Sequence, residues 1–230
     1  MDKKLVDIYD KIQARSDDFD NYLRKLLPSN VLRLADKLMT KTNVYLFSGI
    51  IRDYFINSKN SFRDVDFIVD DIDVEAFISD FDTTKNNYGG YKITIGSVTI
   101  DLWNIKNTWG LPYQSLLPFA EYMPETTFFN SSSILYSLNN KQFIVGKPFL
   151  DFLKNKQLDI VLENNSLPAL CIVNSFYYSQ KYKVKFSNRL SQYILDNYEA
   201  YSKEFESIQK KHFKKVLYPE NELLKLIHTI

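Results

Sequence analysis

The stretch NVYLFSGIIRDYFI (residues 43–56), followed by RDVDFIV (63–69), decides the fold of this chain. NVYLF (43–47) is a short, mostly apolar run, which predicts a buried strand. Ser48-Gly49 is a turn signal, and IIRDYFI (50–56) returns to apolar residues at helical spacing. VDFIV (65–69) is a second short apolar run. The two stretches therefore predict a strand, a tight turn, a helix and a second strand.

The segments on either side complete the prediction of an α+β fold. Apolar residues recur at helical spacing through the first forty residues, and the acids of 70–75 predict the N-terminus of a helix that continues through Phe81. YKITI (91–95), the turn Gly96-Ser97 and VTIDLW (98–103) predict a β-hairpin. Short extended segments are expected over 128–145, and from 149 onward the periodicity is almost wholly helical. We predict a head domain over 1–120, with a small mixed sheet flanked by helices, and an all-α, neck-like domain over 121–230.

Composition excludes several classes of protein. The 230 residues carry 29 Lys+Arg and 28 Asp+Glu, a formal charge of +1, so no global basic field attracts nucleic acid or membrane. Cys171 is the one cysteine and there are two histidines, which argues against disulfides and Cys/His zinc sites. No stretch approaches the ~18 apolar residues of a membrane span. These features predict a cytoplasmic protein without a membrane partner; the oligomeric state stays open.

Two carboxylates fall on one face of the second strand. Asp64 and Asp66 are one residue apart, so their side chains share a face, with Cα atoms about 6.6 Å apart. Val65, Phe67 and Val69 take the other face and can be buried. Two aspartates on one strand face repel each other unless a cation lies between them. We therefore predict that Asp64 and Asp66 bind a divalent metal, Mg²⁺ or Mn²⁺.

A third carboxylate and a phosphate site fit the same chemistry. In VTIDLW, Asp101 shares a face with Thr99 and Trp103, so it can join the pair if this strand lies beside 65–69. Three such carboxylates can hold two Mg²⁺ ions for phosphoryl transfer. Ser48-Gly49 offers backbone N–H groups to a phosphate. Arg52 and Arg63 are candidate triphosphate contacts, although an ion pair that positions the turn explains Arg52 equally well.

The motifs S-G-I-I-R-D (48–53) and R-D-V-D (63–66) resemble a known family. They are similar to G-G-x-V-R-D followed by D-x-D in the head of class II tRNA nucleotidyltransferases (CCA-adding) and bacterial poly(A) polymerases, within the DNA polymerase β-like superfamily. The resemblance covers residues 30–200. It implies that Gly49 lies in the phosphate-cradling turn, that Asp64 and Asp66 are metal ligands, and that Asp101 is the further carboxylate of the superfamily.

The chain also departs from the family's pattern. Ser48 stands for the first turn glycine, and Glu125-Thr126-Thr127 for an R-R-D motif at the entry to the neck. The base-reading motif E-D-x-x-R falls near 165–169, where its Asp and Arg are missing. Faithful C-C-A addition is therefore not expected of this chain.

Two functions follow from these residues. The first is a metal-dependent nucleotidyltransferase that transfers NMP from an NTP to a hydroxyl and releases pyrophosphate, with a tRNA-like RNA 3′ end as the favoured acceptor. A protein side chain or a small molecule stays open as acceptor. The alternative is a catalytically degenerate module that binds nucleotide or RNA.

Other residues have simpler interpretations. Tyr88, Tyr91, Trp103 and Trp109 are candidates for base stacking, although core packing accounts for most of the 16 Tyr and 17 Phe. The lysines of KKHFKK (210–215) more often form a solvated helix face than an RNA track. His212 and His228 come too late in the chain and are too isolated to be expected as catalytic bases.

Overall fold

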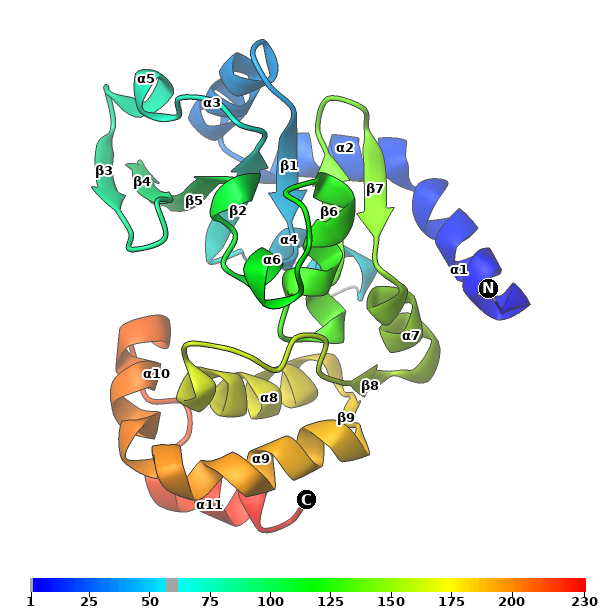
Figure 1. Cartoon of the computed structure of the whole chain (residues 1–230), viewed down its shortest axis with the longest axis vertical. Coiled ribbons are helices and arrows are strands. Elements are labelled where there is room, and N and C mark those ends of the chain that lie inside the picture. The colour runs from blue at the N-terminus through cyan, green and yellow to red at the C-terminus, as the bar shows by residue number, and fades with distance from the viewer. Residues whose placement is uncertain (1, 57–61) are drawn as a thin grey trace.

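The computed structural model describes residues 2–56 and 62–230, and it has two parts (Figure 1). The N-terminal part contains a seven-stranded sheet with helices packed around it. The C-terminal part is a group of helices that lies below the sheet in this view. The expected α+β fold, a mixed sheet flanked by helices and followed by a helical part, is confirmed.

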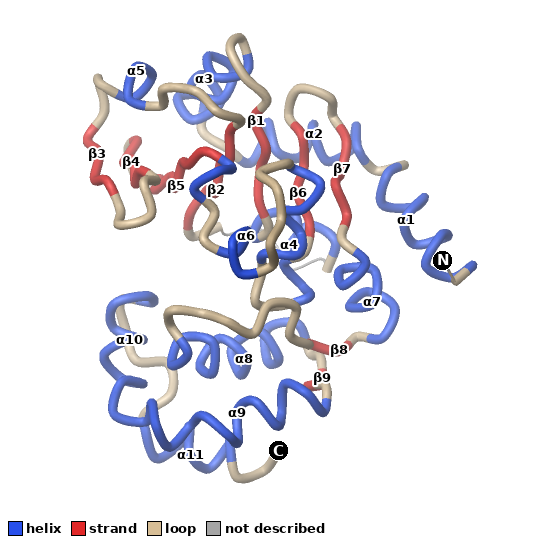
Figure 2. Tube along the Cα trace, viewed as in Figure 1, coloured by secondary structure: helices blue, strands red, loops and turns tan. Residues whose placement is uncertain are grey.

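The sheet has the strand order β3-β4-β5-β2-β1-β6-β7. Its strands are β1 (Val44–Phe47), β2 (Asp64–Val69), β3 (Asp82–Lys85), β4 (Tyr91–Ile95), β5 (Val98–Asn104), β6 (Ile134–Ser137) and β7 (Gln142–Val145). The pair β2–β5 is parallel and every other neighbouring pair is antiparallel. The parallel pair lies at the centre, and Figure 2 shows its strands in red.

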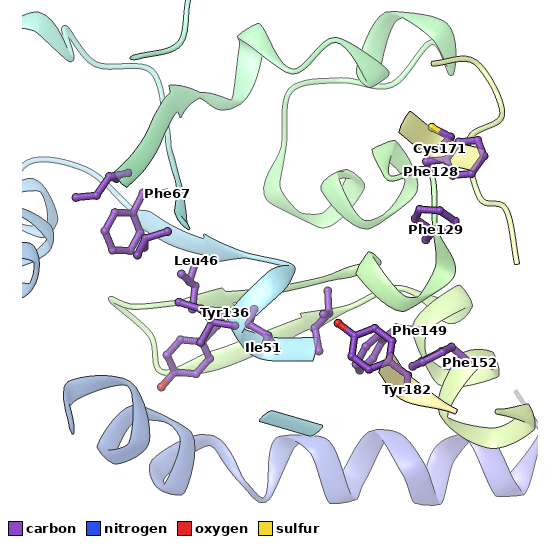
Figure 3. Close-up of a cluster of buried hydrophobic side chains, with 14 of the residues drawn as sticks. Leu46, Ile51, Phe67, Phe128, Phe129, Tyr136, Phe149, Phe152, Cys171 and Tyr182 are labelled. Carbon is purple, nitrogen blue, oxygen red and sulfur yellow. The ribbon is translucent and has the colours of Figure 1, made fainter. Parts of the chain in front are cut away.

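Alternation along β2 separates a dry face from a polar one. Val65, Phe67 and Val69 have no exposed surface and belong to the main core. Figure 3 shows Phe67 in this core with side chains of other elements, among them Leu46 of β1 and Ile51 of α4 (Gly49–Phe55). Burying three apolar side chains stabilises this strand by about 5 kcal/mol before entropic costs. Asp64 and Asp66 are thereby directed to the opposite face.

The helices of the N-terminal part are α1 (Lys3–Gln13), α2 (Ser16–Leu26), α3 (Ser29–Met39), α4, α5 (Glu75–Ile78) and α6 (Gly110–Tyr113). The first three confirm the helical prediction for the first forty residues. The helix expected through Phe81 ends earlier, at Ile78, because the chain turns there into strand β3. That strand pairs antiparallel with β4, Thr83 opposite Ile93, a pairing that its polar sequence does not announce.

Strands β6 and β7 carry the sheet beyond residue 120. They form the extended segments expected around Asn139-Asn140, and β6 pairs antiparallel with β1. The sheet therefore continues through Val145, while the domain boundary near residue 120 stays a prediction. The helices after it are α7 (Lys147–Asn155), α8 (Pro168–Tyr182), α9 (Asn188–Tyr201), α10 (Phe205–Phe213) and α11 (Glu220–Ile227). Two short strands, β8 (Gln157–Leu158) and β9 (Lys185–Phe186), form a separate parallel pair among them.

Across residues 2–56 and 62–230, none of the helices combines the length and the apolar character that spanning a membrane requires.

Candidate active site

Three carboxylates meet on the polar face of the central strand pair. The register of the parallel pair β2–β5 sets Asp66 directly beside Asp101, and Asp64 beside Thr99. The strand of Asp101 therefore lies beside the strand of Asp64 and Asp66, which is the arrangement that lets Asp101 join the pair. Neighbouring strands lie about 4.8 Å apart, which brings the side chains of Asp66 and Asp101 to one place.

The outer two carboxylates are in ion pairs. Asp64 accepts hydrogen bonds from Nε and Nη2 of Arg63, at 2.9 and 2.7 Å. Asp101 is opposite Lys92 of β4, and the Lys92 ammonium lies 2.7 Å from its Oδ1. Arg63 and Lys92 are each 52% exposed, so both cations can move away at little cost.

Asp66 lies between them and is held differently. It is half-buried, and among the described residues its carboxylate makes neither a hydrogen bond nor an ion pair. Burial, reinforced by the negative charges of Asp64 and Asp101, raises the pKa of Asp66 from 3.8 to about 8. A carboxylate in this position is stabilised as an anion only when further positive charge arrives.

The donor set fits a hard divalent cation. All three side chains offer carboxylate oxygens, the ligands that Mg²⁺ and Mn²⁺ prefer. In residues 2–56 and 62–230 no group of three His, Cys, Asp or Glu side chains is already gathered closely enough to hold a metal ion. The reason is visible in the ion pairs, because Asp64 and Asp101 are turned toward Arg63 and Lys92. Binding would require these two side chains to change partner.

The turn between β1 and α4 is strained at Ser48. This residue has φ 52° and ψ −84°, in a region that favours glycine, and its carbonyl accepts a hydrogen bond from the Arg52 N–H at 2.8 Å. A Cβ at Gly49 would meet no atom within 4 Å, so the surface above Gly49 is open. Ser48 lines the same cavity as Asp66. The turn therefore lies beside the carboxylates, as the sequence predicted.

Arg52 is buried and ties the two parts of the molecule together. Its Nε donates to the Tyr182 hydroxyl at 2.7 Å, and its Nη1 donates to Oγ of Ser132 at 2.9 Å. The guanidinium also lies 4.4 Å from the ring centroid of Tyr178. Burial raises the pKa of Tyr182, whose hydroxyl stays protonated and donates to Asp53 at 2.6 Å. These contacts give Arg52 a positioning role between α4 and α8; a nucleotide contact stays a prediction.

A cavity of about 470 Å³ opens beside the carboxylates. Asp66 and Asp101 form part of its wall. Most of the rest is aromatic or carries an amide or hydroxyl group: Phe47, Asn86, Tyr88, Trp103, Asn107, Thr108, Trp109, Thr126, Thr127, Phe128, Ser132 and Asn165. None of the described residues that line it is a lysine or an arginine. The cavity thus suits a flat, uncharged group such as a nucleobase. Tyr91, a fourth candidate for stacking, is bonded to Glu75 instead.

Thr126, Thr127 and Asn165 stand where the family that the sequence resembles has charged motifs, and all three line this cavity. The Thr127 hydroxyl is buried and lies 3.0 Å from the Ser133 hydroxyl, and the Thr126 hydroxyl donates to the Met123 carbonyl at 2.8 Å. Asn165 lines the same cavity. The Tyr88 hydroxyl reaches Ser166 at 3.1 Å, which links the turn between β3 and β4 to the segment before α8.

His212 is the neighbour of the site that sequence reasoning missed. It comes from α10, yet its Nε2 contacts Nη1 of Arg63, 149 residues away in the sequence. Burial, together with the charge of Arg63, lowers the pKa of His212 to about 4. No local signal could have found this contact, because only the fold brings α10 close to Arg63.

Solved structures of similar fold show which class of fold this chain has. A CCA-adding enzyme with CTP matches with a TM-score of 0.63 and 13% identity over 90% of this chain and 53% of that one. A tRNA nucleotidyltransferase complexed with a primer tRNA and an incoming ATP analog matches at 0.59, with 18% identity over 86% and 59%. A tRNA-processing enzyme with CTP matches at 0.59, with 16% identity over 86% and 55%. The chain has a nucleotidyltransferase-like fold.

The sequence comparisons do not narrow this class. No protein-family model matches the chain, and no curated protein matches it either. The chain spans between half and three fifths of the length of these structural neighbours. The comparisons therefore show the fold of this chain and do not show its reaction.

Proposed function

We propose that the protein is a metal-dependent nucleotidyltransferase that transfers NMP from an NTP to a hydroxyl, with a tRNA-like RNA 3′ end as acceptor. One observation carries the proposal: Asp64, Asp66 and Asp101 share the polar face of two adjacent parallel strands beside an open cavity. Three carboxylates on one face are costly to fold. A reaction that needs positive charge at this point explains why they are present together.

Each group of residues has its own role in the proposed transfer. The acceptor oxygen forms a bond to the α-phosphorus, and the bond from that phosphorus to the pyrophosphate oxygen breaks. Asp101, which lies beside Asp66, accepts the hydrogen bond of the attacking hydroxyl and passes its proton to solvent. In this proposal the Ser48-Gly49 turn and Arg63, which line the cavities on either side of the turn, position the phosphates, and the aromatic cavity holds the base. Asp64, Asp66 and Asp101 would hold Mg²⁺, which supplies the charge that neutralises the phosphates and lowers the pKa of the hydroxyl.

A label-transfer assay tests this reaction. Purified protein is incubated with Mg²⁺ or Mn²⁺, each α-³²P-labelled NTP in turn, and total small RNA. We expect label in RNA with the native protein and a loss of at least about 10³-fold in Asp66→Asn. Asp71→Asn is the matched control, since Asp71 is 69% exposed, lies just beyond β2 and pairs with Lys106. Equal transfer by all three proteins, or none by the native protein, contradicts the proposal.

A second candidate function has its own support. The ion pairs of Asp64 with Arg63 and of Asp101 with Lys92 are what a site without metal would keep, and they favour a degenerate module that binds nucleotide or RNA. Calorimetric titration with Mn²⁺ separates the two. Tight uptake by the native protein and Asp71→Asn, but not by Asp66→Asn, favours the enzyme; equally weak uptake by all three favours the module.

A further inference from the structure

A second groove of about 470 Å³ borders the carboxylates on the side of α10. Asp64, Thr99 and Asp101 form one wall, and Leu167, Leu170 and Ile208 contribute apolar surface. The other lining residues are of basic types: Arg63, Lys92, Lys211, His212 and Lys214. These five residues define what is called here the basic groove. They come from three distant segments, which only the folded chain brings together.

The basic groove has more positive than negative side chains in its lining. Arg63 and Lys92 are paired with Asp64 and Asp101, but in the described part of the chain Lys211 and Lys214 form no ion pair. The groove therefore has an excess of two positive charges, with His212 neutral. Lys210, one residue away on the same helix, is paired with Glu206 and does not line the groove.

The helix that carries these lysines is firmly anchored. Gln209 of α10 has no exposed surface, and its side chain bonds both the carbonyl of Phe205 and that of Tyr218, at 3.0 and 2.9 Å. Its Oε1 accepts hydrogen bonds from the N–H groups of Leu217 and Tyr218. The last turn of α10 and the chain after it are thus fixed. A cationic surface held rigidly beside the carboxylates loses little entropy when it binds an anion.

We propose that the basic groove binds the phosphate backbone of the acceptor strand, a single-stranded RNA end, and leads its terminal hydroxyl to Asp101. The inference rests on the proposed function, because it supplies the acceptor side of that reaction. Asp101 lines both the groove and the aromatic cavity, so a strand in the groove and a nucleotide in the cavity would meet at this carboxylate. An excess of positive charge without a base-sized aromatic lining suits a backbone better than a base.

Oligonucleotide binding tests the groove without any reaction. A fluorescein-labelled decaribonucleotide of mixed sequence is titrated in EDTA at several salt concentrations, with anisotropy as the readout. We expect Lys211→Gln/Lys214→Gln to weaken binding about tenfold and to reduce the slope of log K against log salt by about 1.4, two phosphate contacts at about 0.7 each. Lys210→Gln/Lys215→Gln removes the same charge from the same end of the chain, outside the groove, and is expected to change binding less than twofold.

The outcomes separate this inference from the reaction. Equal weakening by both double variants, no binding by the native protein, or displacement of the RNA by poly-glutamate at equal charge overturns the groove as an acceptor site. Transfer by the native protein with unchanged binding in Lys211→Gln/Lys214→Gln overturns the groove and leaves the reaction standing. Groove-dependent binding with no transfer supports the groove and removes the reaction. Thermal unfolding of each variant checks that these exposed substitutions leave the fold intact.

Discussion

The aromatic cavity and the basic groove share Asp101 and have similar volumes, yet they differ in charge and in origin. The cavity contains two aspartates and no lysine or arginine among the described residues that line it, and nearly all of it comes from residues 47–132. The groove has four lysines and arginines, of which Lys211 lies in α10 and Lys214 directly follows that helix. The cavity is therefore a property of the sheet-containing part, whereas the groove exists only because the helical part packs against it. A nucleotide and a strand would thus be bound by different parts of the chain.

Substitution of Asp101, the carboxylate that both surfaces share, tests the comparison most strongly. Asp101→Asn removes the group that orients the hydroxyl but leaves both binding surfaces in place, so transfer is expected to fall about 10²- to 10³-fold. Oligonucleotide binding should stay as tight or become tighter, because Lys92 loses its pair. Asp82→Asn, on the exposed strand β3, serves as control. Weakened binding of both ligands in Asp101→Asn would show that the two surfaces are not independent.

Weakening the contact between the sheet-containing part and the helical part should impair the basic groove more than the aromatic cavity. Arg52→Lys keeps the buried charge but loses the fork that bonds Tyr182 and Ser132, at an expected cost of about 2 kcal/mol in the free energy of unfolding. We expect weaker oligonucleotide binding with little change in KM for the nucleotide. Arg24→Lys, at a guanidinium that is 46% exposed, should cost less than about 0.5 kcal/mol. A change in KM as large as that in RNA affinity contradicts this separation.

The pH dependence of stability reports on Asp66, a carboxylate that lines the cavity but not the groove. The pKa of Asp66 is about 8 in the folded protein and 3.8 ordinarily, so between these values the unfolded chain releases a proton that the folded chain keeps. This difference favours unfolding as pH rises from 4 to 8 and vanishes below pH 4. In EDTA, urea denaturation should show that the native protein loses at least about 1 kcal/mol more than Asp66→Asn between pH 5 and 7.5. Parallel curves for the two proteins would contradict the assignment.

A smaller effect is expected at the mouth of the cavity. Tyr88 is 52% exposed and lines the cavity, so Tyr88→Ala should raise KM for the nucleotide about fivefold by loss of stacking. Tyr88→Phe keeps the ring and loses only the bond to Ser166, and its KM should stay within twofold of native. Tyr9→Ala is the control, because it removes an exposed aromatic ring of α1 that does not line the cavity. If Tyr88→Phe is as defective as Tyr88→Ala, the bond to Ser166 and not the ring matters.

Much of the sheet-containing part could be predicted from local pattern. Apolar periodicity predicts the strand, turn and helix of 43–56, the hairpin of 91–103 and the first three helices. It does so because backbone geometry sets the spacing at which side chains return to the same face of a helix or strand. Strand β3 escaped prediction because Asp82–Lys85 has no apolar alternation and is held by its pairing with β4. Within the stretch expected to be helical, residues 190–213 are divided between α9 and α10 by a short 3₁₀ turn at Ser202–Glu204.

The sequence by itself determined that Asp64 and Asp66 share one strand face, because side chains alternate along any strand, and that Ser48-Gly49 ends the strand before it. Only the tertiary structure decided that Asp101 lies beside Asp66, since a parallel pairing joins segments with no local link and its register depends on packing. The burial of Arg52 under Tyr182 and the approach of His212 to Arg63 were decided in the same way. Local geometry acts within a few residues, whereas these contacts depend on which apolar faces of the whole chain pack together.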